Sequence, residues 1–209
     1  MKAFISKFIS GYSRGAFFLL FLIVCMLTLQ VIDEKEFSLF QYQRNDILSG
    51  QLWRLVSGHF VHVTWLHLIL NLAGLIVVWM LFKDILIQRT WWLLTLGSIV
   101  GIDVALLGFH PEIKWYMGLS GVLHGYFAGG AILQIRLRGA RGLLYLILLI
   151  IKLLWEYLNG PLPGSGELSG GRVITEAHLY GAIGGAIVAI GLILIHYDFQ
   201  RRSHTDEEP

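Results

Sequence analysis

Long, mainly apolar runs alternate with short polar segments along the whole chain. Each run approaches the roughly 20 residues that an α-helix needs to cross a lipid bilayer. The pattern predicts six membrane-spanning helices, at about residues 16–32, 64–82, 91–109, 117–135, 142–158 and 176–197. Because no soluble domain or internal repeat interrupts it, we expect one all-α, polytopic membrane domain over residues 1–209.

Composition supports this interpretation. Of the 209 residues, 56% are hydrophobic and only 14% are charged, which is unlike an ordinary globular domain. The formal net charge of +2 comes without a basic stripe, so we expect no nucleic-acid partner. The single Cys25 excludes a disulfide framework and a cysteine-based metal site. We expect no cofactor and no metal, and membrane lipid as the surroundings.

Basic residues mark one side of the predicted membrane domain. If six helices cross, the following residues all fall on that side: Lys2, Lys7, Arg14, Lys83, Arg89, Arg136, Arg138, Arg141, Arg201 and Arg202. Loops rich in Lys and Arg stay in the cytoplasm. Both termini are therefore expected to be cytoplasmic, and the opposite side receives the long segment 33–63 and the Gly-, Pro- and Ser-rich segment 159–171.

Three polar side chains are predicted at one depth in the membrane. At about 1.5 Å of helix rise per residue, Ser120 lies roughly 24 Å from Arg136, and His67 lies roughly 24 Å from Lys83. By the same count, His178 lies roughly 28 Å from the inner end of its own run. In a hydrocarbon core about 30 Å thick, all three lie just beneath the outer surface.

Glycines at four-residue spacing accompany two of these side chains. Gly121, Gly125 and Gly129 follow the serine in the fourth helix, and Gly181 and Gly185 follow the histidine in the sixth. Small residues at this spacing let helix backbones approach closely. The glycines fit a purely packing role, but a tight crossing of these two helices would also bring the serine and the histidine together.

The chemistry of the polar layer favours a serine hydrolase. Ser120 would be the nucleophile and His178 the base that takes its proton. His67 and Asn71 share one helix face and would stabilise the oxyanion formed by attack on a carbonyl. No carboxylate is expected beside His178, because Asp103 is near the middle of its helix and Glu176 faces another way, so we expect a catalytic dyad.

Several other residues are candidates for a supporting role. We expect His124, Gly118 and Gly121 to lie close around the nucleophile, although His124 also fits a histidine that is simply hydrogen-bonded inside the bundle. Asp103 should pair across the bundle with a partner that the sequence does not name. The predicted fifth helix carries Lys152 and Glu156 at a spacing that favours a helix-surface ion pair.

Three sequence motifs resemble those of the rhomboid family of intramembrane serine proteases. Residues 118–121 (Gly-Leu-Ser-Gly) are similar to its GxSG motif, His67 and Asn71 to its HxxxN motif, and residues 177–185 to its AHxxGxxxG motif. Residues 53–54 and 58–62 are similar to the first loop of that family. The resemblance implies a six-helix fold, a Ser120–His178 pair, and a scaffold role for Arg54, His59 and His62 in that loop.

Within this family the stretch Gly118–Gly125 looks most like the rhombosortase branch. That resemblance implies a bacterial inner-membrane enzyme whose active site lies near the periplasmic face. It also implies protein substrates that carry a C-terminal sorting tail, made of a Gly-Gly motif, a transmembrane helix and a basic end. The acyl-enzyme would be resolved by water or by transfer to an amine-bearing acceptor. Leu119 departs from the commoner rhomboid pattern, where a small residue is frequent.

Three other functions stay open at this point. One is a general rhomboid protease that cuts single-span membrane proteins. Another is a transporter or channel in which His67, His124, His178 and Asp103 relay protons or bind a metal. The last is a non-catalytic relative that binds membrane clients. Against the transporter, the polar layer lies near one surface only, and paired Gly/Pro breaks at mid-depth are missing from the sequence.

Overall fold

The computed structural model shows a bundle of long helices, and it describes residues 15–33 and 39–205. About 75% of the chain is helical, with almost no strand, which confirms the predicted all-α class. The long helices are α2 (Ala16–Asp33), α5 (Trp65–Phe82), α6 (Gln88–Phe109), α7 (Ser120–Arg138), α8 (Ala140–Asn159) and α10 (Thr175–Thr205). The short elements are β1 (Tyr42–Gln43), α3 (Arg44–Leu48), α4 (Arg54–Ser57), β2 (Trp115–Tyr116) and α9 (Ser165–Ser169).

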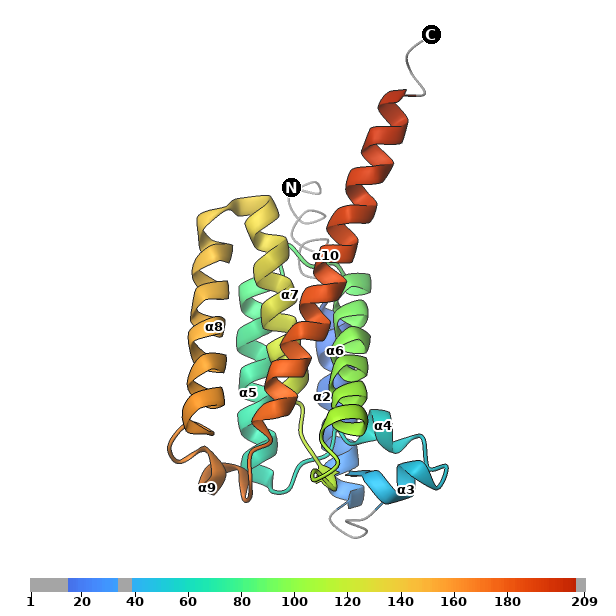
Figure 1. The fold of residues 1–209 in the computed structure, drawn as a ribbon, viewed down its shortest axis with the longest axis vertical. Helices are drawn as coiled ribbons and strands as arrows, with labels where there is room; N and C mark the ends of the chain where they lie inside the picture. The colour runs from blue at the N-terminus through green and yellow to red at the C-terminus, as the bar shows by residue number, and fades with distance from the viewer. Residues whose placement is uncertain (1–14, 34–38, 206–209) are drawn as a thin grey trace, which may run out of the picture.

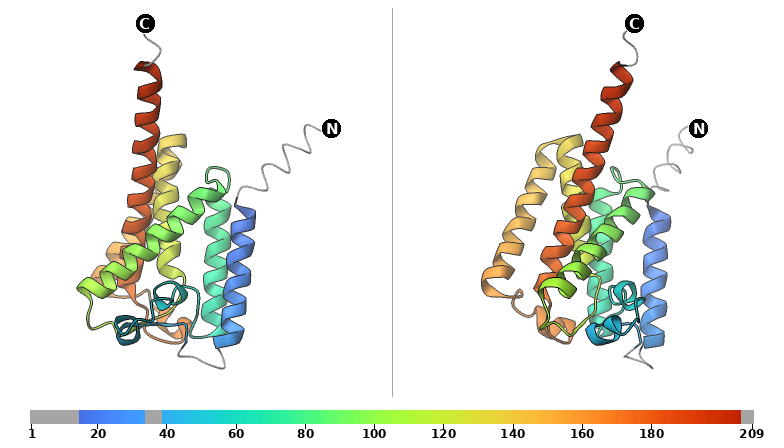
Figure 2. Two further views of the ribbon diagram at one scale, coloured as in Figure 1. Left: turned by 90° about the vertical axis from the view of Figure 1, so that its right-hand side faces the viewer. Right: turned by 45° about the vertical axis from the view of Figure 1, so that its right-hand side comes forward.

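The long helices run alternately in opposite directions (Figure 1). Helices α5, α7 and α10 begin at the end of the bundle where α3, α4 and α9 gather, whereas α2, α6 and α8 finish there (Figure 2). The basic residues Lys83, Arg89 and Arg141 therefore lie toward the opposite end, in or beside the α5–α6 and α7–α8 turns. Lys2, Lys7 and Arg14 of the same predicted cytoplasmic set, and the side chains of Arg138, Arg201 and Arg202, lie outside the described residues.

Within the described part of the chain, four helices are long and apolar enough to cross a membrane. They are Trp65–Phe82, Gln88–Phe109, Ala140–Asn159 and the Thr175–Ile195 portion of α10, and they support a multi-pass membrane protein. Helix α2 is apolar but shorter, and α7 contains glycines and polar residues that lower its hydropathy. The count of six spans and the cytoplasmic termini therefore stay predictions.

Helix α7 can be less apolar than its neighbours because it is surrounded by protein. It packs against α5, α6, α8 and α10, and its contact with α10 is the most extensive between any two of the described elements. A helix that faces other helices rather than lipid does not need a continuous apolar surface. This central position also explains why α7 and α10 can carry polar side chains inside the membrane domain.

Glycines set the close approach of α10 to two neighbours. A Cβ added at Gly181 would overlap the carbonyl oxygen of Gly121, and one added at Gly185 would overlap that of Gly125. On the other side of α10, a Cβ at Gly101 of α6 would lie 2.7 Å from the carbonyl oxygen of Tyr180. The two predicted glycine seams therefore face each other, and α6 adds a third seam that the sequence analysis did not identify.

Candidate active site

The backbone before α7 fixes the position of Ser120. Gly118 has a φ of +124°, which an L-residue rarely adopts, and its N–H donates to the carbonyl of Gly58 at 3.1 Å. The hydroxyl of Tyr116 donates to the carbonyl of Gly118 at 2.6 Å. The first bond ties the segment to the first loop and the second fixes its turn, so that Ser120 begins α7 at the end of the bundle that carries α9 (Figure 1).

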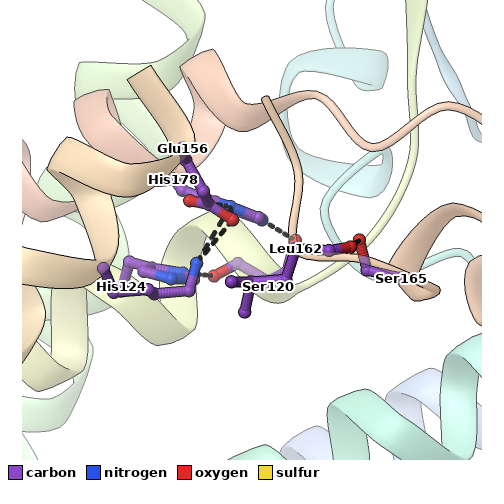
Figure 3. Close-up of polar contacts among 7 residues, drawn as sticks. Ser120, His124, Glu156, Leu162, Ser165 and His178 are labelled. Atoms are coloured by element: carbon purple, nitrogen blue, oxygen red, sulfur yellow. Dashed lines mark hydrogen bonds and ion pairs between the residues drawn. The ribbon is translucent and has the colours of Figure 1, made fainter. Parts of the chain in front are cut away.

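Ser120 and His178 meet across the α7–α10 crossing. The Oγ of Ser120 lies 3.0 Å from Nε2 of His178, within hydrogen-bond distance, and the His178 side chain is buried (Figure 3). The helices can come this close because Gly121 packs directly against the backbone of Ala177. The sequence expectation that two distant helices bring these side chains together matches this geometry.

A carboxylate also contacts His178, and the sequence analysis did not expect one. Both oxygens of Glu156 on α8 lie near Nδ1 of His178, at 2.9 and 3.1 Å (Figure 3). Lys152 pairs with Glu156 at 2.8 Å, so the predicted ion pair forms. It is not a helix-surface pair, however, because Glu156 is only 5% exposed and points to the interior. The four-residue spacing correctly predicted the ion pair, but it did not show that this face of α8 points into the bundle.

His67 and Asn71 lie on the other side of Ser120. Both line a cavity of about 260 Å³ together with Ser120 and His178. The His67 ring packs against Gly118, where an added Cβ would lie 2.9 Å from Cε1 of the ring. The Asn71 amide donates to the carbonyl of His67 at 3.0 Å. The imidazole of His67 and the amide of Asn71, both on α5, therefore line the same cavity as Ser120.

His124 lies one turn along α7 from Ser120. Its Nδ1 is 2.7 Å from the carbonyl oxygen of Ser120, and its ring stacks on His178 with centroids 4.2 Å apart and planes 16° from parallel. The predicted closeness to the nucleophile matches this position. The stack supports one face of the His178 ring and leaves its two nitrogens to Ser120 and Glu156.

The residues able to hold a metal belong to this same cluster. Among the described residues, His124, Glu156 and His178 place candidate ligand atoms within 4.8 Å of one another. Stacked imidazoles hold their nitrogen lone pairs in nearly parallel planes, which do not converge on one ion. The ammonium of Lys152 also forms an ion pair with the Glu156 carboxylate, where it competes with a metal ion. The cluster is therefore arranged for hydrogen bonding rather than for coordinating a cation.

The other ionisable residues of the sequence analysis lie in the supporting structure. Asp103 pairs with His59 at 3.2 Å, which identifies the partner that the sequence could not name. Arg54 is buried, pairs with Asp46 at 3.2 Å and donates to the carbonyl of Gln41 at 2.9 Å. The Asp103–His59 pair holds the first loop against α6, whereas Arg54 joins parts of the segment before α5 to one another, and none of these pairs includes Ser120.

His62 links the first loop to the start of α7. Its Nε2 accepts a hydrogen bond from the N–H of Leu119 at 3.4 Å, directly before Ser120. Burial, with a smaller contribution from His67, lowers the pKa of the His62 imidazole to about 3. A neutral imidazole with a free Nε2 lone pair is required for this bond, so the low pKa and the hydrogen bond are consistent.

Comparison with known protein families identifies the fold. The rhomboid domain profile matches residues 49–195, which is more than half of the chain. A search of curated protein sequences gives no match. The profile spans the first loop, the Ser120 segment and the His178 helix, which are the parts that carry the motif resemblance. The chain therefore belongs to the rhomboid family of intramembrane serine proteases.

Proposed function

We propose that Ser120 is the nucleophile and His178 the general base of this protease. The supporting observation is the 3.0 Å contact between Oγ of Ser120 and Nε2 of His178 at the wall of a cavity. As Oγ bonds to the substrate carbonyl carbon, Nε2 takes the hydroxyl proton. The same proton then passes to the leaving nitrogen while the C–N bond breaks, which leaves an acyl ester on Ser120.

The carbonyl oxygen becomes negatively charged during this step, and the cavity offers donors for it. His67 and Asn71 lie on the α5 side of Ser120, and the first N–H groups of α7 have no partner within the helix. Such donors act because they are already in place when the charge develops. We assign His67 and Asn71 to this oxyanion site.

We further propose that the substrates are exported proteins with a C-terminal Gly-Gly sorting tail, as in rhombosortases. The support is the motif resemblance of residues 118–125 together with the position of His124, which in this chain stacks on His178. Glycine suits a cleavage site, because it leaves a helix at a cost about 1 kcal/mol lower than alanine. Water or a primary amine then attacks the ester carbonyl carbon and gives a proton to His178, which passes it to Oγ of Ser120 as the ester C–O bond breaks.

The proposed location is the bacterial inner membrane, with the active site near the periplasmic face. In support, Ser120 and His178 lie at the end of the bundle opposite the basic turns (Figure 1). Lys and Arg favour the cytoplasmic side, which supports a site that faces the outside. A substrate helix would approach from the lipid and unwind at that end.

A fluorophosphonate probe tests the nucleophile. The purified protein should be labelled, and Ser120→Ala should abolish labelling. Ser165→Ala is the matched control, because Ser165 also lines the cavity but its hydroxyl donates to the carbonyl of Leu162 at 2.6 Å. A folded wild-type protein that is not labelled would argue against activation of Ser120.

Mass spectrometry tests the substrate class. A tail-bearing client, coexpressed with this protein, should end at or beside its Gly-Gly motif. A product whose mass equals the cleaved chain indicates water as the acceptor, whereas added mass on the new C-terminal carboxyl indicates an amine. Cleavage confined to other positions would instead support a general rhomboid protease.

A further inference from the structure

We infer that Glu156 is a positioning residue that completes a Ser120–His178–Glu156 triad, and that Lys152 keeps its carboxylate charged and in place. This inference rests on the proposed roles of Ser120 and His178. Glu156 is 5% exposed and lies 2.9 Å from Nδ1 of His178. It contacts the base on the nitrogen opposite the one that faces the nucleophile (Figure 3).

The role of Glu156 follows from the tautomer that catalysis needs. Nε2 of His178 can take the Ser120 proton only if it carries none of its own, so the ring proton must be on Nδ1. A carboxylate only accepts hydrogen bonds, and it lies beside Nδ1. It therefore selects the tautomer with the proton on Nδ1 and leaves the Nε2 lone pair directed at the hydroxyl.

Lys152 is the competing partner for the same nitrogen. Its Nζ is 3.4 Å from Nδ1 of His178, and a bond from this ammonium would require Nδ1 to be bare and Nε2 to be protonated. That tautomer cannot act as a base toward Ser120. However, the ammonium lies closer to Glu156, at 2.8 Å, than to the ring. Glu156 thus holds Lys152 as well as His178.

Charge compensation explains why the carboxylate comes with a lysine. A lone charge within a membrane domain is costly, and such groups pair with one another. Lys152 is one helical turn from Glu156 on α8, so a single helix supplies both charges. When His178 becomes an imidazolium during attack, the negative Glu156 lies beside it, and no group has to reorganise.

His124 contributes to the same arrangement. Its ring stacks on one face of His178 and limits rotation of the imidazole. The positioning of His178 therefore comes from two directions: a carboxylate in the plane of the ring and a second ring above it. Of these, only Glu156 distinguishes Nδ1 from Nε2.

Glu156→Gln tests the inference in the full-length protein. A glutamine amide can donate to Nδ1 as well as accept, so the tautomer is no longer selected. We expect fluorophosphonate labelling of Ser120 to be at least about 100-fold slower, by analogy with the loss of the orienting carboxylate in other serine proteases. Glu156→Asp, which keeps the charge, should recover part of the rate. Glu176→Gln removes a carboxylate two residues before His178 and should label within about threefold of the wild type.

The single variant leaves Lys152 uncompensated, and the charge-neutral variant Lys152→Gln/Glu156→Gln avoids that problem. It should unfold at nearly the wild-type temperature and still be labelled at least about 100-fold slower. Histidine ¹⁵N spectra provide a readout that a merely structural role would not change. The His178 signal, identified by its loss in His178→Gln, should show the Nδ1–H tautomer in the wild type and the Nε2–H tautomer in greater amount in Glu156→Gln.

Wild-type labelling rates or an unchanged tautomer in the folded double variant would overturn this role for Glu156. The failure of the wild type itself to be labelled is a different result. It would remove the proposed nucleophile and base, whereas labelling of the wild type and the variants at equal rates would remove only Glu156.

Discussion

Single side chains determine how well the cavity can stabilise negative charge. We predict that His67→Ala and Asn71→Ala each lower kcat for tail cleavage by about 10²- to 10³-fold, because each removes a donor that we assign to the oxyanion site. KM should change much less, since the donors act mainly in the transition state. Cleavage kinetics in detergent measure both constants. A rise in KM with kcat unchanged would indicate a role in substrate binding instead.

We predict that His62 makes the folding stability depend on pH. Because the pKa of His62 is about 3 in the folded protein, against an ordinary value near 6.5, the unfolded chain binds a proton at a pH where the folded chain does not. The stability is therefore complete above about pH 6.5 and decreases as the pH falls toward 3. Each pH unit in this range costs up to about 1.4 kcal/mol, or roughly 3–6 °C in unfolding temperature.

Thermal unfolding between pH 7.5 and pH 4 checks this prediction. His62→Gln keeps an acceptor for the Leu119 N–H but does not titrate, so its unfolding temperature should decrease less steeply. Parallel curves for the two proteins would show that other groups cause the acid sensitivity.

At this scale the sequence was informative where a motif is local. The Gly118–Gly121 segment and the spacing of His67 and Asn71 identify residues that line one cavity in the structure. Glu156 could not be assigned in the same way, because an acidic residue four positions after a lysine fits an exposed ion pair equally well. Its role depends on whether the polar face of α8 turns toward the bundle or away from it, and the spacing of two residues along the helix does not decide that.

Between elements, the crossing of α7 and α10 decides whether nucleophile and base meet. We predict that Gly181→Ala lowers the labelling rate of Ser120 by about 100-fold, because the added methyl overlaps the Gly121 carbonyl and pushes the helices apart. Overpacking of this kind also costs about 1–3 kcal/mol of stability.

Gly191→Ala provides the control on the same helix. A Cβ at Gly191 meets no atom within 4 Å, so this variant should keep both labelling and stability. If Gly181→Ala behaved like Gly191→Ala, close backbone contact would not be what brings Ser120 to His178.

Helix boundaries and packing partners differ in how far the sequence determines them. The predicted run 142–158 lies within α8, Ala140–Asn159, because Gly139 and Gly160 flank it with positive φ values. Gly97 and Gly101 of α6 have the same four-residue spacing, but no candidate side chain accompanies them, so the sequence analysis did not identify this third seam. Spaced glycines predict a close contact, whereas the structure shows which helix each of them faces.

For the whole molecule, the alternation of helix directions places the basic turns and the candidate site at opposite ends (Figure 2). The sequence predicted that separation from the basic residues and the helix rise, and the positive-inside rule supports the proposed orientation. It could not predict how a substrate helix reaches Ser120, because that depends on which helices have little packing to hold them together.

We predict a route for the substrate beside α8. Helix α8 packs mainly on α7, and an open hollow of about 250 Å³ lies between α5 and α8 beside α7, lined by Val77, Leu148 and Lys152 among others. We propose that a substrate tail enters here. A short thiol crosslinker joining Val77→Cys to Leu148→Cys, in a Cys25→Ser background, should block cleavage of a membrane-anchored tail. A small fluorophosphonate, which reaches the cavity from the aqueous end, should still label Ser120.

Either cysteine alone, treated with the same reagent, is the control. Cleavage at the uncrosslinked rate would place substrate access elsewhere, and loss of labelling would mean that the crosslink distorts the site itself.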